Sequence, residues 1–439
     1  MPAVDPVESD DTLPQRADVV VVGGGIIGVS TAYHLARRGL AVTLCEKGTI
    51  GAEQSSRNWG FCRSQNRDPA EIPLMLESLR QWRGLDAELG EDTGFRQSGI
   101  LYVAKTPQKM AAFERWYELG RQYQLDTRLL TADEAAELLP GSSERWLGAL
   151  YTPTDGRAEP TKAAPAIARG LRRAGGAVVT HCAVRGYETS GGKVSAVVTE
   201  RGRIETSALV VAGGAWTSLF LRRHAIRFPQ MKVLSSVMRT TPMEEVFAGG
   251  LWAPDFAFRR RTDGGYTISD GNSVFDVVPD LLPNFRTFLP AFLHERAGMK
   301  IRFGRRFFEE LSFPSSWSLD ATTPFEKHRV LDPAPYRPAL DRAWVKLRQT
   351  FPAFEKASIV ERWGGLIDTT PDAVPAISAI DGNPGLFIAS GFSGHGFGIG
   401  PGAGRLMADI VAGDAPCVDP APFRYSRFVD GSKLVPFIR

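Results

Sequence analysis

The sequence lacks several features that would place a protein in a class at once. No stretch of about 18 or more apolar residues occurs in its 439 residues, so no membrane-spanning helix is expected. Its four cysteines have no CxxC spacing and no zinc-type pattern with histidine, so we expect reduced thiols and no metal site. With 52 basic and 49 acidic residues, the net charge is only +3, which argues against a nucleic-acid partner.

The first fifteen residues also lack what a secretory signal needs. They carry four acidic residues, no basic residue and no apolar core. Together with thiols expected to be reduced, this favours a cytoplasmic protein. We expect residues 1–16 to form a flexible leader before the folded part of the chain, whose length corresponds to two or three domains.

Glycine, in contrast, is abundant. The chain has 45 glycines, about 10% of its residues, against an average near 7%. Because glycine weakens helices and strands, an excess indicates either many tight turns or a backbone that approaches a ligand closely.

The first glycine cluster lies in a nucleotide-binding pattern. Residues 17–22 form a short β-branched run typical of a buried parallel strand. Residues 23–28 then read GGGIIG, which fits G-x-G-x-x-G, and residues 29–38 have helical character. The first glycine permits the tight turn, the second lets a pyrophosphate reach the backbone, and the third lets helix and strand pack closely.

A second strand, residues 41–45, ends in Glu46, 23 residues after Gly23. This is the usual offset for a carboxylate that accepts hydrogen bonds from ribose hydroxyls. The complete strand, turn, helix, strand and carboxylate therefore predict a dinucleotide-binding unit.

Three later segments favour FAD over NAD. A loop rich in small and hydroxyl residues, 51–60, follows the second strand directly. Residues 207–216 form another strand that ends in glycines. Near the C-terminus, a strand leads into the glycine-rich residues 391–400 and a helix over 402–411.

With these segments the chain resembles the FAD-dependent amine and amino-acid oxidoreductases, which include D-amino-acid oxidase, glycine oxidase and monomeric sarcosine oxidase. The resemblance is strongest at residues 18–63, 207–216 and 386–408, and residues 391–397 (GFSGHGF) are especially similar to sarcosine oxidases. It implies that this last segment passes beside the isoalloxazine. The helix after it would point its N-terminus at the N1–C2=O edge of the flavin.

The resemblance also implies the architecture: an α/β protein in which a Rossmann-like FAD-binding domain is interleaved with an α+β substrate domain built on a large, mostly antiparallel sheet. The expected FAD-binding segments are 17–73, 151–228 and 363–413, the substrate domain is 74–150 and 229–362, and residues 414–439 form a tail packed on the FAD domain.

FAD is expected to be bound without a covalent link. Residues 361–368 match the segment in which several sarcosine oxidases carry a flavin-linked cysteine, and this chain has none there. No histidine of the kind used by other relatives occurs in residues 54–60. The expected cofactor-binding residues are Gly23, Gly25, Ile26, Ile27, Gly28, Glu46, Lys47, Ser55, Ser56, Arg57, Asn58, Trp59, Val184, Ala212, Gly213, Trp216, Gly391, Gly394, His395, Gly396, Phe397, Gly398 and Ile399.

Arg63 is the leading candidate for the substrate's carboxylate. It matches the first of two basic residues that hold the carboxylate in sarcosine oxidases, and its planar guanidinium suits bidentate binding. The alternative is an ordinary loop salt bridge. The second basic residue, a lysine, is replaced by Gly398, which suggests a bulkier substrate.

Other catalytic candidates are weighed against plain structural roles. His395 lies in the glycine-rich turn and either polarises flavin or substrate, or satisfies loop backbone. Trp363 either walls the pocket or only packs. Tyr266 and Arg259 lie on strands, where half of the side chains point away from any one site.

The expected reaction is hydride transfer from an amine or amino acid to flavin N5, giving an imine that water hydrolyses. Secondary amines and N-methyl or cyclic amino acids are favoured. Oxidation of a C–OH bond, an FAD-bearing subunit without catalysis and an NAD enzyme remain as alternatives. No counterpart of the oxygen-activating lysine of sarcosine oxidases is clear, so O₂ and another electron acceptor both stay open, as does the oligomeric state.

Overall fold

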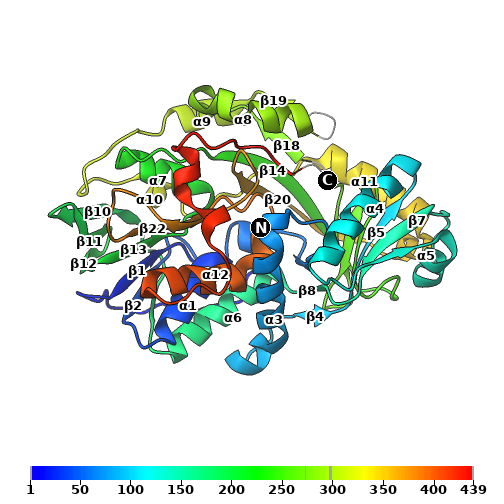
Figure 1. Cartoon of the computed structure of the whole chain (residues 1–439), viewed down its shortest axis with the longest axis horizontal. Helices are drawn as coiled ribbons and strands as arrows, with labels where there is room; N and C mark the ends of the chain where they lie inside the picture. Colours follow the sequence, from blue (N-terminus) through cyan, green and yellow to red (C-terminus); the bar gives the residue numbers. More distant parts are fainter. Residues whose placement is uncertain (1, 272, 296–298, 438–439) are drawn as a thin grey trace.

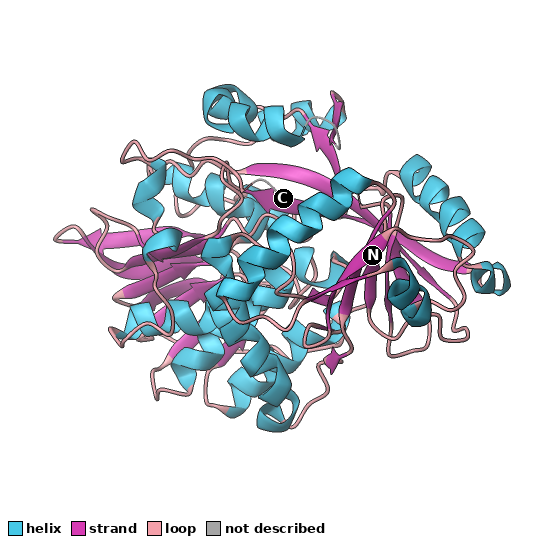
Figure 2. Cartoon of the chain, turned by 45° about the vertical axis from the view of Figure 1, so that its right-hand side comes forward, coloured by secondary structure: helices cyan, strands magenta, loops and turns pink. Residues whose placement is uncertain are grey.

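The computed structural model describes residues 2–271, 273–295 and 299–437. Two groups of strands lie on either side of a set of central helices (Figures 1 and 2). Parallel and antiparallel sheets occur together, which confirms the expected α/β class.

The first sheet has six strands and is parallel except at one edge. Its strands, in spatial order, are β21 (Ala376–Ala379), β22 (Leu386–Ser390), β13 (Ala208–Val211), β1 (Val19–Val22), β2 (Val42–Cys45) and β9 (Ala177–Val179). The expected nucleotide-binding strands β1 and β2 pair in register, Val19 opposite Val42. The central strands are almost completely buried, as their uninterrupted apolar runs predict.

Helices cover the first sheet, and small residues let them approach each other. They include α1 (Ile26–Ala36), α3 (Ile72–Leu89), α6 (Pro160–Arg173), α7 (Thr217–Arg223) and α12 (Gly396–Ala412). A Cβ added at Gly404 of α12 would lie 2.3 Å from the Cβ of Ser30 on α1, so glycine is required where these helices cross.

The second sheet is larger and mostly antiparallel, as expected. Its order is β19 (Met299–Arg302), β18 (Ser273–Asp276), β14 (Met231–Thr240), β17 (Tyr266–Ser269), β16 (Ala257–Arg260), β15 (Gly250–Trp252), β5 (Ile100–Ala104), β7 (Gly148–Thr152) and β6 (Arg128–Leu130). The long strand β20 (Ile359–Thr369) pairs with β14 and then returns the chain to the first sheet. The two sheets are therefore joined by strands that run past the same central space.

Shorter elements complete the fold. Two small sheets contain β10 (Val184–Ser190), β11 (Lys193–Thr199) and β12 (Gly202–Glu205), and β3 (Phe61–Cys62), β8 (Gly156–Arg157) and β4 (Arg96–Gln97). The remaining α-helices are α2 (Gln54–Arg57), α4 (Pro107–Gln122), α5 (Ala132–Leu138), α8 (Leu281–Glu295), α9 (Arg305–Leu311), α10 (Pro324–Lys327) and α11 (Arg337–Thr350). Short 3₁₀ turns are η1 (Pro69–Glu71), η2 (Gly214–Trp216), η3 (Pro352–Lys356), η4 (Ala421–Phe423) and η5 (Tyr425–Phe428).

An outer layer of α8, β19 and α9 lies on one edge of the molecule (Figure 1). Phe288 of α8 is buried against Phe275 of β18, whereas Leu282 on the same helix is 72% exposed. Within the described ranges, no helix is both long and apolar enough to cross a bilayer.

The N-terminal segment, for which we expected a flexible leader, makes specific contacts in the structure. The backbone N–H of Asp5 donates to the Thr161 carbonyl (3.1 Å), and that of Asp10 donates to the Val178 carbonyl (2.8 Å). Glu8 pairs with Arg172 of α6 at 2.7 Å. These contacts place the segment along α6 and β9.

Candidate functional site

A cavity runs from the carboxyl ends of the parallel strands to the second sheet. Its walls include most of the expected cofactor-binding residues: Gly23, Gly25, Ile26, Ile27, Glu46, Lys47, Ser55, Arg57, Asn58, Trp59, Val184, Ala212, Gly213, Trp216, Gly394, His395, Gly396, Phe397 and Gly398. Arg63 lines it too. Segments distant in the sequence thus meet around one space, where the topology of an α/β sheet favours a ligand site.

The turn between β1 and α1 shows why glycines occupy it. Gly23 has φ +108°, and a Cβ there would lie 2.3 Å from the Ala212 carbonyl oxygen. A Cβ at Gly28 would lie 1.9 Å from the Gly23 carbonyl oxygen, so this glycine, which lies outside the lining, serves helix–strand packing. Ser55 Oγ accepts the N–H of Ile26 at the start of α1 (2.8 Å). The N-terminus of α1 therefore faces the cavity, as binding of a pyrophosphate requires.

Glu46 lies at the end of β2 in the cavity wall. Its two carboxylate oxygens accept the N–H groups of Gly24 (2.6 Å) and Gly48 (2.7 Å). These bonds fix the carboxylate beside the glycine turn. Each oxygen keeps further acceptor capacity for a ribose hydroxyl.

Lys47, Glu53 and Trp216 together form a charged and aromatic part of the cavity wall. Lys47 Nζ lies 4.8 Å from the ring centroid of Trp216 and donates to Glu53 Oε1 (2.6 Å). Trp216 Nε1 donates to the same oxygen (3.2 Å). Glu53 was not among the sequence candidates, and only its contacts with two of them reveal it.

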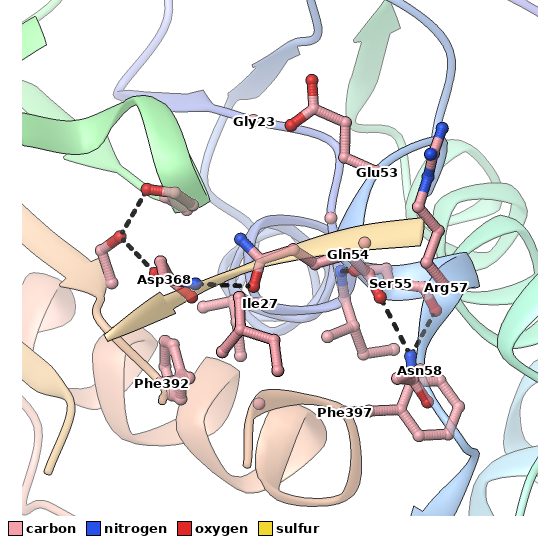
Figure 3. Close-up of a pocket in the computed structure, with 18 of the residues that line it drawn as sticks. Gly23, Ile27, Glu53, Gln54, Ser55, Arg57, Asn58, Asp368, Phe392 and Phe397 are labelled. Atoms are coloured by element: carbon pink, nitrogen blue, oxygen red, sulfur yellow. Dashed lines mark hydrogen bonds between the residues drawn. The ribbon is translucent and has the colours of Figure 1, made fainter. Parts of the chain in front are cut away.

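In the loop after β2, several polar side chains hold the backbone. Asn58 Nδ2 donates to the carbonyls of Gln54 and Ser55, as Figure 3 shows. Arg57 donates to Asp332 (2.6 Å) and to the Gly364 carbonyl (3.0 Å). Both residues line the cavity, but these side-chain bonds primarily fix the loop that carries them.

Asp368, at the end of β20, is a buried acid that the sequence did not single out. Its Oδ2 accepts the Gly391 N–H (2.7 Å), and its backbone N–H donates to Gln54 Oε1 (3.3 Å; Figure 3). Burial raises the pKa of Asp368 to about 6, although the Gly391 N–H acts in the opposite direction. Gly391 itself lies outside the lining and shapes the site through this carboxyl group.

Arg63, Arg67 and two tryptophans gather at the end of the cavity near the second sheet. Arg63 Nη1 donates to the carbonyls of Gln65 and Asn66, and its guanidinium carbon lies 5.7 Å from the Tyr102 ring centroid. Arg67 was not among the sequence candidates, although it is a second arginine only four residues after Arg63.

The tryptophans at this end form an aromatic wall. The rings of Trp59 and Trp252 meet nearly edge to face, with centroids 4.8 Å apart. Trp252, on β15, was not a sequence candidate. The site therefore combines cationic and apolar surfaces.

The N-terminus of α12 enters the same end of the cavity. The carbonyl of Gly398 accepts Ser78 Oγ and Trp82 Nε1 from α3, each at 2.8 Å. A Cβ at Gly398 would lie 2.8 Å from the Phe61 carbonyl oxygen. Backbone approach by β3 thus requires glycine here and excludes a lysine in this geometry. Ile399 and Ser56 are buried but lie outside the lining.

Three other catalytic candidates lie outside the cavity lining. Arg259 is buried in an ion pair with Glu159 (2.8 Å); burial raises the pKa of Glu159, but the charge of Arg259 brings it down to about 2. Tyr266 is on the core-facing side of β17, and its hydroxyl accepts the Val246 N–H (2.8 Å). Trp363 Nε1 donates to the Arg57 carbonyl (3.1 Å).

The chain is similar to known oxidoreductases over nearly its whole length. The sarcosine oxidase subunit beta of Arthrobacter sp is 26% identical over 422 residues, which cover 94% of this chain and 91% of that protein. The glycine oxidase of Geobacillus kaustophilus is 26% identical over 427 residues, covering 95% and 98%. The solved structure of an L-amino acid deaminase from Proteus myxofaciens is 34% identical, covers 97% of this chain and 96% of that chain, and superposes with a TM-score of 0.94.

Residues 18–410 match the DAO family, described as FAD dependent oxidoreductase. The match includes the glycine turn after β1, the loop carrying Arg63 and the start of α12. The chain belongs to this family of FAD-dependent oxidoreductases.

Proposed function

We propose that this chain oxidises the C–N bond of an amine or amino acid with noncovalently bound FAD. The observation that carries the proposal is one continuous cavity with a nucleotide-type glycine turn at one end and Arg63, Arg67, Trp59 and Trp252 at the other. A cofactor held at the first end would meet a carboxylate-bearing substrate at the second.

FAD supplies the hydride acceptor of the reaction. The chain's own residues bind and polarise it. The turn at Gly23 and the N-terminus of α1 would hold the pyrophosphate, and Glu46 the ribose. The N-terminus of α12 would place its partial positive charge against the pyrimidine edge of the flavin.

Arg63 and the aromatic wall would bind the substrate. A guanidinium among buried groups suits a carboxylate, and the Trp59–Trp252 pair suits an apolar or N-alkylated remainder. We therefore favour an amino acid with a secondary, N-methyl or cyclic amine. Hydride leaves its α-carbon and the product imine is hydrolysed by water. We also infer a cytoplasmic location, with O₂ or another acceptor regenerating the flavin.

The test is anaerobic reduction of the purified yellow protein. N-methyl, cyclic and D- or L-amino acids are added one at a time. The matching 2-hydroxy acid is tested in a separate sample. Bleaching by amines alone is expected. Bleaching by the hydroxy acid alone would show that a C–OH bond is oxidised instead. No bleaching by any of them would favour an FAD-bearing subunit.

The noncovalent link is tested separately. Precipitation in acid should release all the flavin into solution. Yellow colour retained in the washed precipitate would contradict the proposal.

A further inference from the structure

A buried acid, Glu71, stands behind the positively charged end of the cavity. Its side chain has no exposed surface, and it is the last residue of η1, directly before α3. Its Oε2 lies 2.9 Å from Nδ1 of His395 and 3.6 Å from Nη1 of Arg67. Both neighbours line the cavity, and Glu71 does not. One carboxylate oxygen therefore touches two cavity-lining groups from behind.

Local bonds hold this arrangement in place. Arg67 Nε donates to the Arg63 carbonyl (3.0 Å), and Nη2 donates to the His395 carbonyl (3.3 Å). Trp116 Nε1 donates to the Arg67 carbonyl (3.2 Å). The loop before α3 is thus tied to the start of α12 through Arg67, and Glu71 meets both.

The charges around Glu71 are of both signs. A carboxylate buried without charged partners would be very unfavourable, but Glu71 has Arg67 and His395 beside it and precedes the first turn of α3. Facing the cavity are Arg63, Arg67 and the N-terminus of α12. When ionised, Glu71 would therefore offset part of a positive potential at this end.

Such a potential acts on a flavin. Two-electron reduction of a bound flavin would add two electrons and one proton, together one hydride when an amine is the donor. It would leave negative charge at the N1–C2=O edge. Nearby positive charge stabilises that product and raises the reduction potential, whereas nearby negative charge lowers it.

We propose that Glu71 is a positioning residue that holds Arg67 and His395 at the flavin-facing end of the cavity and, as a buried anion, lowers the reduction potential of the bound flavin. The proposal rests on the proposed function, which places the flavin beside the start of α12. Glu71 and Arg67 are in contact, and the proposal predicts that removing their charges shifts the reduction potential in opposite directions. General damage to the site would not produce opposite shifts.

The experiment measures the flavin potential of the holoprotein by equilibration with a redox dye of known potential. Glu71→Gln keeps the side-chain shape and removes the charge, so its potential should become more positive. Arg67→Met should make it more negative. Each change is expected to be about tenfold in the flavin–dye equilibrium constant, roughly 30 mV for a two-electron couple.

Glu77→Gln is the matched control. Glu77 lies on α3 and pairs with Arg80 (2.8 Å) and Arg405 (2.7 Å), outside the lining. Its replacement should leave the potential within about twofold of wild type in the same equilibrium constant.

Shifts of the same sign in Glu71→Gln and Arg67→Met, or no shift in either, would overturn the inference. If Glu71→Gln alone does not fold, the double variant Glu71→Gln/Arg67→Met, which removes both charges of the buried pair, decides: the inference requires a more positive potential in the double variant than in Arg67→Met. The dye method needs no substrate, so it separates the two proposals. A flavin that titrates as expected but is never bleached by amines would overturn only the proposed function, and a chain that binds no FAD would overturn both.

Discussion

The parallel sheet meets the cavity mainly with backbone, whereas the large antiparallel sheet meets it with side chains. At the first, Gly23, Ala212 and Gly213 bring main-chain atoms to the wall. At the second, Ser235, Trp252 and Asp368 project into it from β14, β15 and β20. Backbone surfaces suit a cofactor shared by a whole family, and side chains can change with the substrate. We therefore expect cofactor binding to depend mainly on the first sheet, and substrate choice to depend on side chains of the second sheet together with the loop residues Trp59 and Arg63.

Replacing Gly28 should have the largest effect on FAD binding, because it disturbs the backbone turn at the parallel sheet. In Gly28→Val the side chain would overlap the Gly23 carbonyl, since even a Cβ lies 1.9 Å away. We expect loss of bound FAD, measured as flavin absorbance relative to protein. Gly84→Ala on α3 is the control, because nothing lies within 4 Å of its Cβ. Full FAD content in Gly28→Val would refute the close approach.

Arg259→Met tests whether a charged residue of the second sheet serves the fold. It leaves Glu159 buried without its main partner, which should cost about 3–5 kcal/mol in urea unfolding. Arg203→Met, in an exposed pair with Glu188, should cost less than about 1 kcal/mol. Wild-type stability with lost activity in Arg259→Met would instead support a catalytic Arg259.

Asp368 should make stability depend on pH. Its pKa rises from the usual value near 3.9 to about 6 on folding, so the folded chain binds the proton more tightly. This stabilisation is complete below pH 4 and is lost as the pH rises from about 4 to about 6. It amounts to about 3 kcal/mol.

Asp368→Asn should remove that slope. The measurement is the free energy of unfolding of wild type and variant from pH 4 to pH 7. Parallel curves for the two proteins would show that Asp368 titrates normally.

Arg63→Ala tests the side-chain end of the cavity. An acidic substrate analogue should bind more weakly by about 1.5–3 kcal/mol, the value of hydrogen bonds to a charged group. Binding is measured by perturbation of the flavin spectrum. Arg83→Ala, an exposed arginine of α3, should change nothing. An unchanged Kd in Arg63→Ala would remove this residue as the anchor.

The smallest effect is expected on the outer layer of the second sheet. Leu282→Ser replaces a side chain that is 72% exposed and should change stability by less than about 0.5 kcal/mol. Phe288→Ala on the same helix, where the ring is 4% exposed, should cost about 3–5 kcal/mol. Equal losses would mean that Leu282 is covered in solution.

The fold and the residues that line the glycine-turn end of the cavity were largely predictable from the sequence. Gly23, Gly28 and Glu46 are recognised by their spacing in the strand, turn, helix and second strand. The structure places Gly23 and Glu46 in the cavity wall and Gly28 against the Gly23 carbonyl, and their roles toward FAD stay predictions. The assignment of charged residues was harder. The alternation in residues 266–269 puts Tyr266 on the same face as Ile268, and the structure shows this face in the core. For Arg259 the sequence does not show its partner, Glu159, which lies 100 residues away.

The sequence by itself determined the glycine turn, because that depends on neighbouring residues and on backbone conformation. The FAD family and the mixed α/β class followed from a resemblance carried by three separate segments, 18–63, 207–216 and 386–408. Only the tertiary structure decided which charges face the cavity. Arg67 and His395 are 328 residues apart, and Arg259 and Glu159 are 100 apart. A buried charge needs a partner, and that partner comes from whichever segment the fold brings near it.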